Sequence, residues 1–180
     1  MTARSAGPVL NLGCGRKRIN DAINVDVNAR ASPDVICDLD RVPWPFRDGE
    51  VREVFAHDVI EHLHDVVTVM DEIHRVCRTN AIVRITVPHF SSPNAFSDPT
   101  HCRQFGASSF DYFTGDHEPS FYTTSRFRRR VTSIIFAPTF LNKLVRRLAN
   151  RWPARYERRW AWLFPAWFVY VELEVVKSEP

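Results

Sequence analysis

Two glycines and two aspartates follow short apolar runs of the sequence, at positions where they could bind a nucleoside. Gly13 and Gly15 directly follow a short apolar run at residues 9–12, and Asp26 and Asp38 lie near the ends of the next two apolar runs. Glycine tolerates positive φ and, lacking a Cβ, lets a ligand come against the backbone. Ionised carboxylates accept hydrogen bonds from hydroxyl and amino groups. The pattern therefore predicts a site for a nucleoside-containing cofactor.

The same residues argue against a dinucleotide. A Gly-x-Gly-x-x-Gly turn would need its third glycine at position 18, which is Arg18. Too few residues separate Gly15 from Asp26 for a long crossover helix. Acids after the second and third apolar runs suit a ribose diol and an adenine amino group, and they do not suit phosphates. We therefore expect S-adenosylmethionine, which carries no phosphate.

The elements that must position these residues are short strands and one amphipathic helix. Apolar residues recur at three- and four-residue spacing over 65–78, which predicts a helix. Glu72 and Arg75 fall outside that stripe and are expected to be solvated charges. The segments expected to be strands are 9–12, 22–27, 34–40, 53–57, 81–87, 130–137 and 168–176.

Five segments occur in an order that resembles the class I S-adenosylmethionine-dependent methyltransferases, specifically the broad methyltransferase-domain family with a Glu-His-Leu signature. The resemblance covers about residues 8–115 and rests on 10–15, 24–26, 37–39, 42–49 and 60–63. It implies an α/β, Rossmann-like class I methyltransferase fold. The sheet would be seven-stranded and mostly parallel, with an antiparallel last strand and a helical insertion between the last two strands.

The resemblance also implies how the chain is divided and which residues hold the cofactor. We expect one domain over 1–180, with a cofactor-binding core at 8–115 and, at 116–180, the C-terminal strands with a basic aromatic insertion. The residues expected to contact S-adenosylmethionine are Leu12, Gly13, Cys14, Gly15, Asp26, Val27, Asp38, Leu39 and His57.

Histidines are the candidates for a general base, because their pKa lies near neutrality. His89 directly follows the strand at 81–87, and His101 lies on the long loop at 88–113, at the edge where ligands of such sheets bind. These two are the predicted catalytic residues. The alternative for His101 is a hydrogen bond that pins the loop, to Asp98 or to a backbone carbonyl.

A metal site is a further alternative. Asp58, Glu61 and His62 are spaced i, i+3, i+4, so a helix would place them on one face, where His89 or His101 could join them. Some methyltransferases that resemble this chain use such a cluster for magnesium or zinc. The Glu-His-Leu signature is also common in relatives without a metal, so we predict no metal.

The segment 138–165 is basic and aromatic, with a helical apolar stripe, and together with 126–130 it is expected to form the main basic patch. The favoured interpretation is an insertion that packs on the sheet and exposes its arginines to water. A basic amphipathic helix with tryptophans can also lie on a membrane or contact a lipid-linked substrate. A homodimer contact is the third alternative.

Composition limits the class of protein. The chain has 180 residues, 44% of them hydrophobic, and a net charge of only +3, which predicts one globular domain without strong affinity for nucleic acid. Its four cysteines are scattered, which favours free thiols in a reducing compartment. No signal sequence is evident and the apolar run at 160–171 is too short to span a bilayer. We expect a cytoplasmic location.

The predicted function is methyl transfer of EC 2.1.1 type to a small-molecule, glycan or secondary-metabolite acceptor. One alternative is a protein that binds S-adenosylmethionine as an accessory subunit, or that uses it without methylation, as a cyclase would. The other alternative is an RNA-modifying methyltransferase, suggested by the arginines and aromatics of 138–165. The modest net charge argues against nucleic acid.

Overall fold

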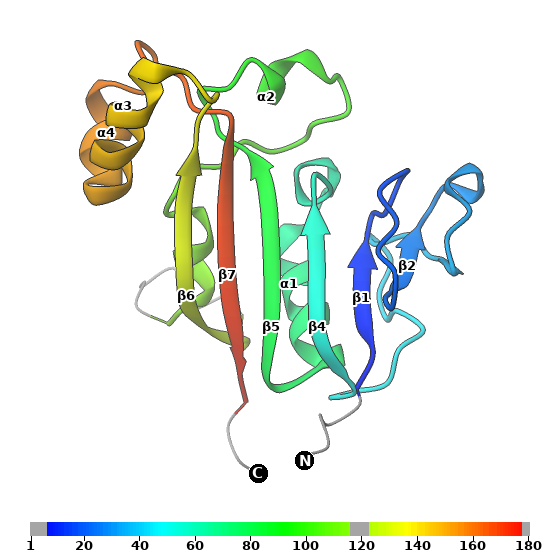
Figure 1. Ribbon diagram of the computed structural model, residues 1–180. Helices are drawn as coiled ribbons and strands as arrows, with labels where there is room; N and C mark the ends of the chain where they lie inside the picture. Colours follow the sequence, from blue (N-terminus) through cyan, green and yellow to red (C-terminus); the bar gives the residue numbers. More distant parts are fainter. Residues whose placement is uncertain (1–6, 116–122, 178–180) are drawn as a thin grey trace.

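The computed structural model describes residues 7–115 and 123–177, and the parts of the predicted domain at 1–6, 116–122 and 178–180 lie outside this description (Figure 1). The strands form one seven-stranded sheet in the order β3-β2-β1-β4-β5-β7-β6. The first five strands are parallel, and β7 is antiparallel to both of its neighbours. This confirms the predicted fold class. The strands are β1 (Val9–Leu12), β2 (Ile23–Asp26), β3 (Val35–Ile36), β4 (Val51–His57), β5 (Cys77–Pro88), β6 (Arg126–Ile135) and β7 (Phe168–Val176).

Helices are few and short. The predicted helix at 65–78 is α1 (Val66–Val76), which begins after Asp65, whose side chain accepts the Thr68 N–H as an N-cap. The insertion between the last two strands contains α3 (Phe140–Arg151) and α4 (Pro153–Arg159). None of the described helices is long and apolar enough to cross a membrane. The remaining elements are α2 (Asn94–Ser97) and the 3₁₀ helices η1 (Ala29–Ala31), η2 (Ile60–His62) and η3 (Ser109–Phe113).

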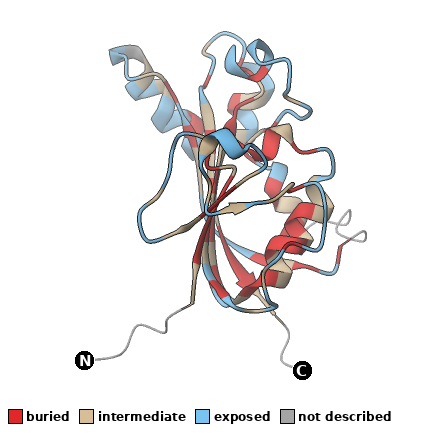
Figure 2. Ribbon diagram, turned by 90° about the vertical axis from the view of Figure 1, so that its right-hand side faces the viewer, coloured by how far each residue is buried: buried red, intermediate tan, exposed pale blue. Residues whose placement is uncertain are grey.

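The main core lies between α1 and one face of the sheet (Figure 2). Val69, Met70 and Ile73 of α1 are at most 1% exposed. They pack on the alternate residues of the strands that point to that face, such as Val54 of β4 and Val83 of β5. The core thus holds the five-stranded parallel part of the sheet together and leaves its carboxyl ends free at one edge.

The opposite face of β4 and β5 is not covered by a helix in the described part of the chain, and it faces the viewer in Figure 1. Parallel sheets are usually covered on both faces. Here the face is polar: Arg84 of β5 pairs with Glu53 of β4 and Glu172 of β7, and its guanidinium lies 5.4 Å from the Phe55 ring centroid. The short connection from β1 to β2 contains no helix, and this leaves the face open.

The prediction that 126–130 and 138–165 form one basic patch is wrong. Arg128 and Arg130 lie near the start of β6 and pair with Glu174 of β7, and Arg129 pairs with Asp111. Because β6 runs away from these arginines toward α3, the two basic segments lie at opposite ends of the strand (Figure 1). The strand also begins earlier than its predicted start at residue 130.

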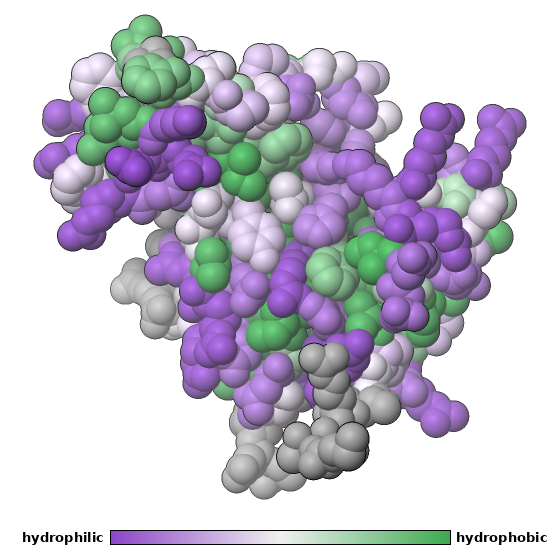
Figure 3. All heavy atoms as spheres, in the orientation of Figure 1, coloured by the Kyte–Doolittle hydropathy of each residue, from purple (hydrophilic) through white to green (hydrophobic). Residues whose placement is uncertain are grey.

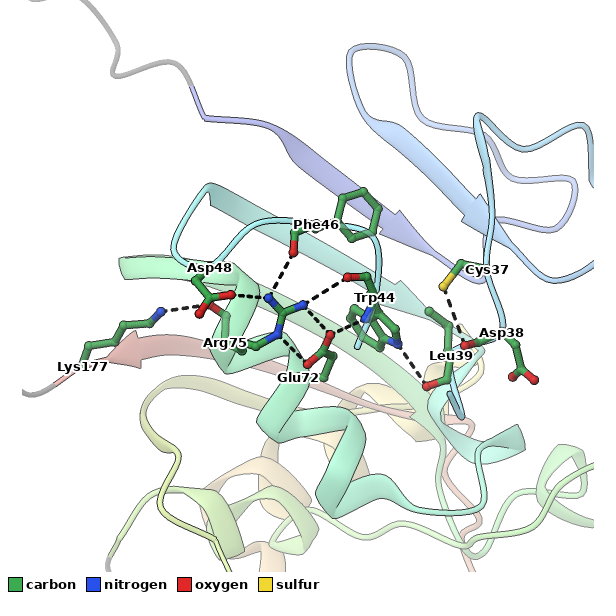
Figure 4. Close-up of polar contacts among 9 residues, drawn as sticks. All are labelled: Cys37, Asp38, Leu39, Trp44, Phe46, Asp48, Glu72, Arg75 and Lys177. Atoms are coloured by element: carbon green, nitrogen blue, oxygen red, sulfur yellow. Dashed lines mark hydrogen bonds and ion pairs between the residues drawn. The ribbon is translucent and has the colours of Figure 1, made fainter. Parts of the chain in front are cut away.

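The expectation that Glu72 and Arg75 are solvated is also wrong. Glu72 is 6% exposed, and the Arg75 guanidinium donates to both of its carboxylate oxygens, at 2.8 and 2.6 Å (Figure 4). Arg75 also donates to the carbonyls of Trp44 and Phe46 and pairs with Asp48. The pair therefore ties the segment that precedes β4 to α1, a contact that helical spacing alone does not reveal.

Replacing Arg75 should destabilise the fold. In Arg75→Met the apolar stem remains, but the buried Glu72 carboxylate loses its cation, and we expect the free energy of unfolding to fall by about 3 kcal/mol. Urea denaturation followed by circular dichroism measures this change. The matched control is Arg47→Met, an exposed arginine on the same segment, which should change stability by no more than about 0.5 kcal/mol. Equal stability of the two variants would contradict the role given to the pair.

Candidate functional site

The glycine bend after β1 is held by a close contact with the segment after β4. Gly13 has φ +61°, and a Cβ at this position would lie 2.3 Å from Cγ2 of Val59. No side chain fits there, so glycine is required both by the backbone conformation and by packing. Gly15 has φ +46°, and a Cβ there would meet nothing within 4 Å. The bend is thus closed toward the protein at Gly13 and open at Gly15.

The Asp26 side chain contacts this bend. Its Oδ2 accepts the Gly15 N–H at 2.8 Å, and its Oδ1 accepts the Asn28 N–H at 2.8 Å. The carboxylate at the end of β2 is therefore fixed beside the open glycine, as a ribose-binding acid would have to be.

Other residues predicted around the cofactor differ in their surroundings. Asp38 follows β3, where its Oδ1 accepts the Asp40 N–H and its Oδ2 lies 3.1 Å from Arg41 Nε. Leu39 is buried in the main core, whereas Val27 is 64% exposed. Asp38 and Val27 are thus accessible at the β2–β3 end of the edge, whereas Leu39 belongs to the core.

A pocket of about 440 Å³ opens at the carboxyl ends of β1 and β4, beside the start of β7. It contains three residues predicted to bind the cofactor, Gly13, Cys14 and His57. The structure brings these three together at one edge of the sheet, where the arrowheads of β1, β4 and β5 end (Figure 1). The full lining is Asn11, Gly13, Cys14, Lys17, Arg18, Ile19, His57, Asp58, Thr86 and Phe168.

The pocket wall carries two polar pairs. Lys17 Nζ lies 2.8 Å from Asp58 Oδ2, which places opposite charges side by side. His57 Nδ1 lies 2.9 Å from Thr86 Oγ1, and burial lowers the pKa of this histidine. Cys14 is almost fully buried, and burial raises the pKa of its thiol. The wall therefore carries one ion pair, and burial disfavours the charged forms of His57 and Cys14 beside it.

Glu61 and His62 lie on the 3₁₀ turn η2, and not on the α-helical face that the spacing of Asp58, Glu61 and His62 would give. Glu61 is 1% exposed, and burial raises the pKa of its carboxyl to about 7. His101 comes from the loop after α2, and its Nε2 lies 4.0 Å from Glu61 Oε1. The structure thus brings Glu61, His62 and His101 together, while Asp58 pairs with Lys17 instead.

His89 is placed apart from this group. Its ring is fully buried, with Nδ1 2.8 Å from Ser91 Oγ and Nε2 3.2 Å from Glu157 Oε1. Glu157 also accepts the Ala107 N–H. In this conformation His89 links the loop after β5 to α4 and does not line the pocket.

Sequence reasoning did not single out Asn11, Thr86 or Phe168 for the pocket. A signal was available for Asn11, which is a polar residue inside an apolar strand. Thr86 meets His57 only through the pairing of β5 with β4, which the sequence does not show. Phe168 begins β7 and reaches the pocket only because this strand inserts next to β5, which no local pattern indicates.

Comparison with known proteins gives a family and a fold. Residues 10–85 match the family described as methyltransferase domain. A comparison with curated proteins found no match. The family match runs from within β1 to within β5 and so includes the glycine bend, Asp26 and most of the residues that line the pocket.

Several solved structures are similar. A S-adenosylmethionine-dependent methyltransferase from Archaeoglobus fulgidus is 17% identical, with a TM-score of 0.66 over 95% of this chain and 87% of that one. The YcgJ protein from Bacillus subtilis is 13% identical, with a TM-score of 0.61 over 98% and 94%.

A third similar structure holds a bound cofactor product. It is geranyl diphosphate C-methyltransferase from Streptomyces coelicolor, in complex with Mg²⁺, geranyl diphosphate and S-adenosylhomocysteine. It is 13% identical, with a TM-score of 0.60 over 95% of this chain and 74% of that one. Residues 10–85 therefore belong to the methyltransferase-domain family, and the chain has the fold of the class I S-adenosylmethionine-dependent methyltransferases.

Proposed function

We propose that this chain binds S-adenosylmethionine at the glycine bend and transfers its methyl group to a small-molecule, glycan or secondary-metabolite acceptor. The observation that carries the proposal is the Asp26 carboxylate, which the N–H of Gly15 holds against the same glycine bend whose Gly13 and Cys14 line a pocket of about 440 Å³. A fixed carboxylate beside an open glycine suits the ribose hydroxyls of a cofactor without phosphates. The family match over residues 10–85 supports the same cofactor.

The two ends of the cofactor have different recognition groups in this proposal. The adenosine lies toward Gly15, Asp26 and Asp38, the acids at the ends of β2 and β3. The methionine part is a zwitterion, and the Lys17–Asp58 pair offers one charge for each of its ends: the ammonium of Lys17 for the carboxylate, and the carboxylate of Asp58 for the amino group. Asp58 Oδ1 is buried and has no hydrogen-bond partner among the described residues, so it can still accept a hydrogen bond from the amino group.

Bound S-adenosylmethionine supplies an activated methyl group, which an acceptor takes in line while the electron pair of the broken C–S bond stays on sulfur. The chain's part is to orient the two molecules and to remove the acceptor's proton where the acceptor is a hydroxyl. Of the two histidines predicted for that step, His101 lies beside Glu61, on the loop after α2. His89 would have to leave Ser91 and Glu157 to take part.

Replacing Asp26 should weaken cofactor binding. Asp26→Asn removes the charge that would receive the ribose hydroxyls, and we expect S-adenosylhomocysteine to bind about 10- to 150-fold less tightly, equivalent to about 1.5–3 kcal/mol. Isothermal titration calorimetry measures the affinity. Asp21→Asn is the matched control, an exposed aspartate in the same β1–β2 connection, and it should bind like the unaltered protein. If the unaltered protein binds neither S-adenosylmethionine nor S-adenosylhomocysteine, the proposal fails.

Replacing Lys17 should affect only the amino-acid end. Lys17→Met is expected to weaken S-adenosylhomocysteine binding by up to about fivefold, the size typical of an exposed ion pair. Binding of 5′-methylthioadenosine, which has no amino-acid part, should stay unchanged in this variant but weaken in Asp26→Asn. A Lys17→Met variant that binds both ligands equally less tightly would contradict the orientation proposed above.

A further inference from the structure

Glu61, His62 and His101, called here the Glu61 cluster, form a group of metal-ligand type outside the cofactor pocket. One carboxylate oxygen and one nitrogen from each imidazole all lie within 4.8 Å of one another. The two rings meet edge to face, with centroids 4.7 Å apart. Two separate segments supply the residues, η2 and the loop after α2, and the Cys102 and Arg103 N–H groups donate to the Glu61 carbonyl to hold the segments together.

The carboxylate of this cluster lacks partners. Both oxygens of Glu61 are buried, and neither has a hydrogen-bond partner among residues 7–115 and 123–177. A buried carboxylate without donors is strongly destabilising unless it binds a proton or a cation. The two imidazoles of the cluster each have a nitrogen close enough to share a cation with it.

One nitrogen of each imidazole, Nδ1, is already engaged, which leaves Nε2 of each ring to carry a lone pair. His101 Nδ1 lies 3.4 Å from the carbonyl of Ala95, to which it donates, so its Nε2 carries the lone pair on the side of Glu61. His62 Nδ1 lies 2.8 Å from Thr100 Oγ1, and this hydroxyl donates in turn to Asp98. The hydroxyl therefore accepts from His62, whose Nε2 is left with a lone pair. Metal-binding histidines typically have such outer partners.

We propose that Glu61, His62 and His101 bind a divalent transition-metal ion such as Zn²⁺ or Mn²⁺. Imidazole nitrogens favour transition metals over Mg²⁺ and Ca²⁺, which prefer all-oxygen ligands. A tetrahedral zinc ion with ligands at about 2.1 Å separates them by about 3.4 Å, so binding draws the cluster together by about 1.4 Å at most. Three protein ligands leave a coordination position open for water or for another ligand. His101 is then a metal ligand in place of the general base predicted from the sequence.

The test measures binding of the metal alone, so it does not depend on the proposed function. Calorimetric titration with ZnCl₂ and MnCl₂ should give one ion per chain, bound more tightly than Mg²⁺. His101→Gln and Glu61→Gln should each weaken binding by about tenfold or more. Titration with Co²⁺ adds a readout of geometry, since its visible absorption bands report the ligand set and should be lost in both variants.

His64→Gln is the matched control for these variants. His64 is two residues from His62, but it is exposed and pairs with Asp40 rather than with the cluster. Its replacement should leave the affinity and the Co²⁺ spectrum unchanged. The proposal is overturned if the unaltered protein binds no Zn²⁺ or Mn²⁺ at one ion per chain, or if both cluster variants bind the ion as tightly as it does. Circular dichroism of each variant separates lost ligands from lost structure.

An independent observation concerns the insertion at 138–165. Four apolar residues spaced four apart, Phe140, Leu144, Leu148 and Trp152, form one stripe along α3 and are 49–91% exposed. After α4, Trp160, Trp162 and Leu163 are 49–70% exposed. Exposed apolar groups on this scale mark an interaction surface.

The charge of the same segment indicates what that surface meets. The segment 138–165 contains seven of the chain's basic residues and one acidic residue, Glu157. Its formal charge is therefore +6 (7 − 1), in a chain whose net charge is +3. Glu157 points inward to His89 and Ala107. Figure 3 shows the basic and apolar side chains side by side over α3 and α4. The basic residues, all exposed, are Lys143, Arg146, Arg147, Arg151, Arg155, Arg158 and Arg159.

We infer that this surface docks on an anionic lipid bilayer. Tryptophan and leucine enter the headgroup boundary, and arginines pair with anionic headgroups. An apolar groove of about 430 Å³ between α3 and α4, lined among others by Leu144, Leu148 and Trp160, gives space for part of an acyl chain. The excess of positive charge beside exposed apolar side chains matches the anionic headgroups and the apolar interior of such a bilayer.

Vesicle flotation tests this second inference. The protein should bind vesicles of equal parts phosphatidylcholine and phosphatidylglycerol, and should bind pure phosphatidylcholine vesicles far less. Leu163→Ser and Arg158→Gln should each weaken binding by about fivefold. Ile36→Ser is the control, because Ile36 is equally exposed, at 63% against 65% for Leu163, but lies on β3. Equal binding to both vesicle types, no binding, or a dimer that Leu163→Ser dissociates would overturn the inference.

Discussion

The contact between Gly13 and Val59 is the constraint on which the rest of the site depends. It joins the end of β1 to the segment that follows β4, at a distance that no side chain at position 13 would permit. The Gly13–Gly15 bend is thereby held next to Asp58, and Glu61 follows within one turn. The bend and the Glu61 cluster are therefore positioned by the same backbone approach, and displacing one would displace the other.

Much of the fold could be predicted from local pattern. The apolar runs gave β1, the helical spacing gave α1 within two residues at each end, and the alternation at 168–176 gave β7. Each of these signals depends on side chains that face the core, and burial selects residue type strongly there. The turn of Asp26 toward the glycine bend also agrees with the sequence, because strands that end in acids have their carboxyl ends at one edge.

What the sequence did not reveal involves contacts between distant segments. Glu72 lies at a helix position that local spacing assigns to solvent, yet Trp44 donates its N–H to it across 28 residues. From the sequence alone, Arg128 and Arg130 belong to a basic run without partners, but β7 places Glu174 beside both of them. His89 reads as an edge residue, but α4 supplies the carboxylate that encloses it. In each case the decisive partner comes from an element whose placement is set by the tertiary fold.

The face of β4, β5 and β7 that no described helix covers also depends on contacts between distant segments. A parallel sheet without a covering helix would expose apolar side chains, and here the exposed face carries the Arg84 ion pairs and the Tyr170 hydroxyl, which donates to Glu172. Charged side chains that pair with each other can stay partly solvated and still shield the strands beneath them. The largest group of exposed apolar side chains among the described residues lies instead on α3 and in the segment after α4, next to the carboxyl end of β6 (Figure 1). Because β6 runs parallel to β5, a bilayer bound there would lie toward the same end of the strands as the pocket.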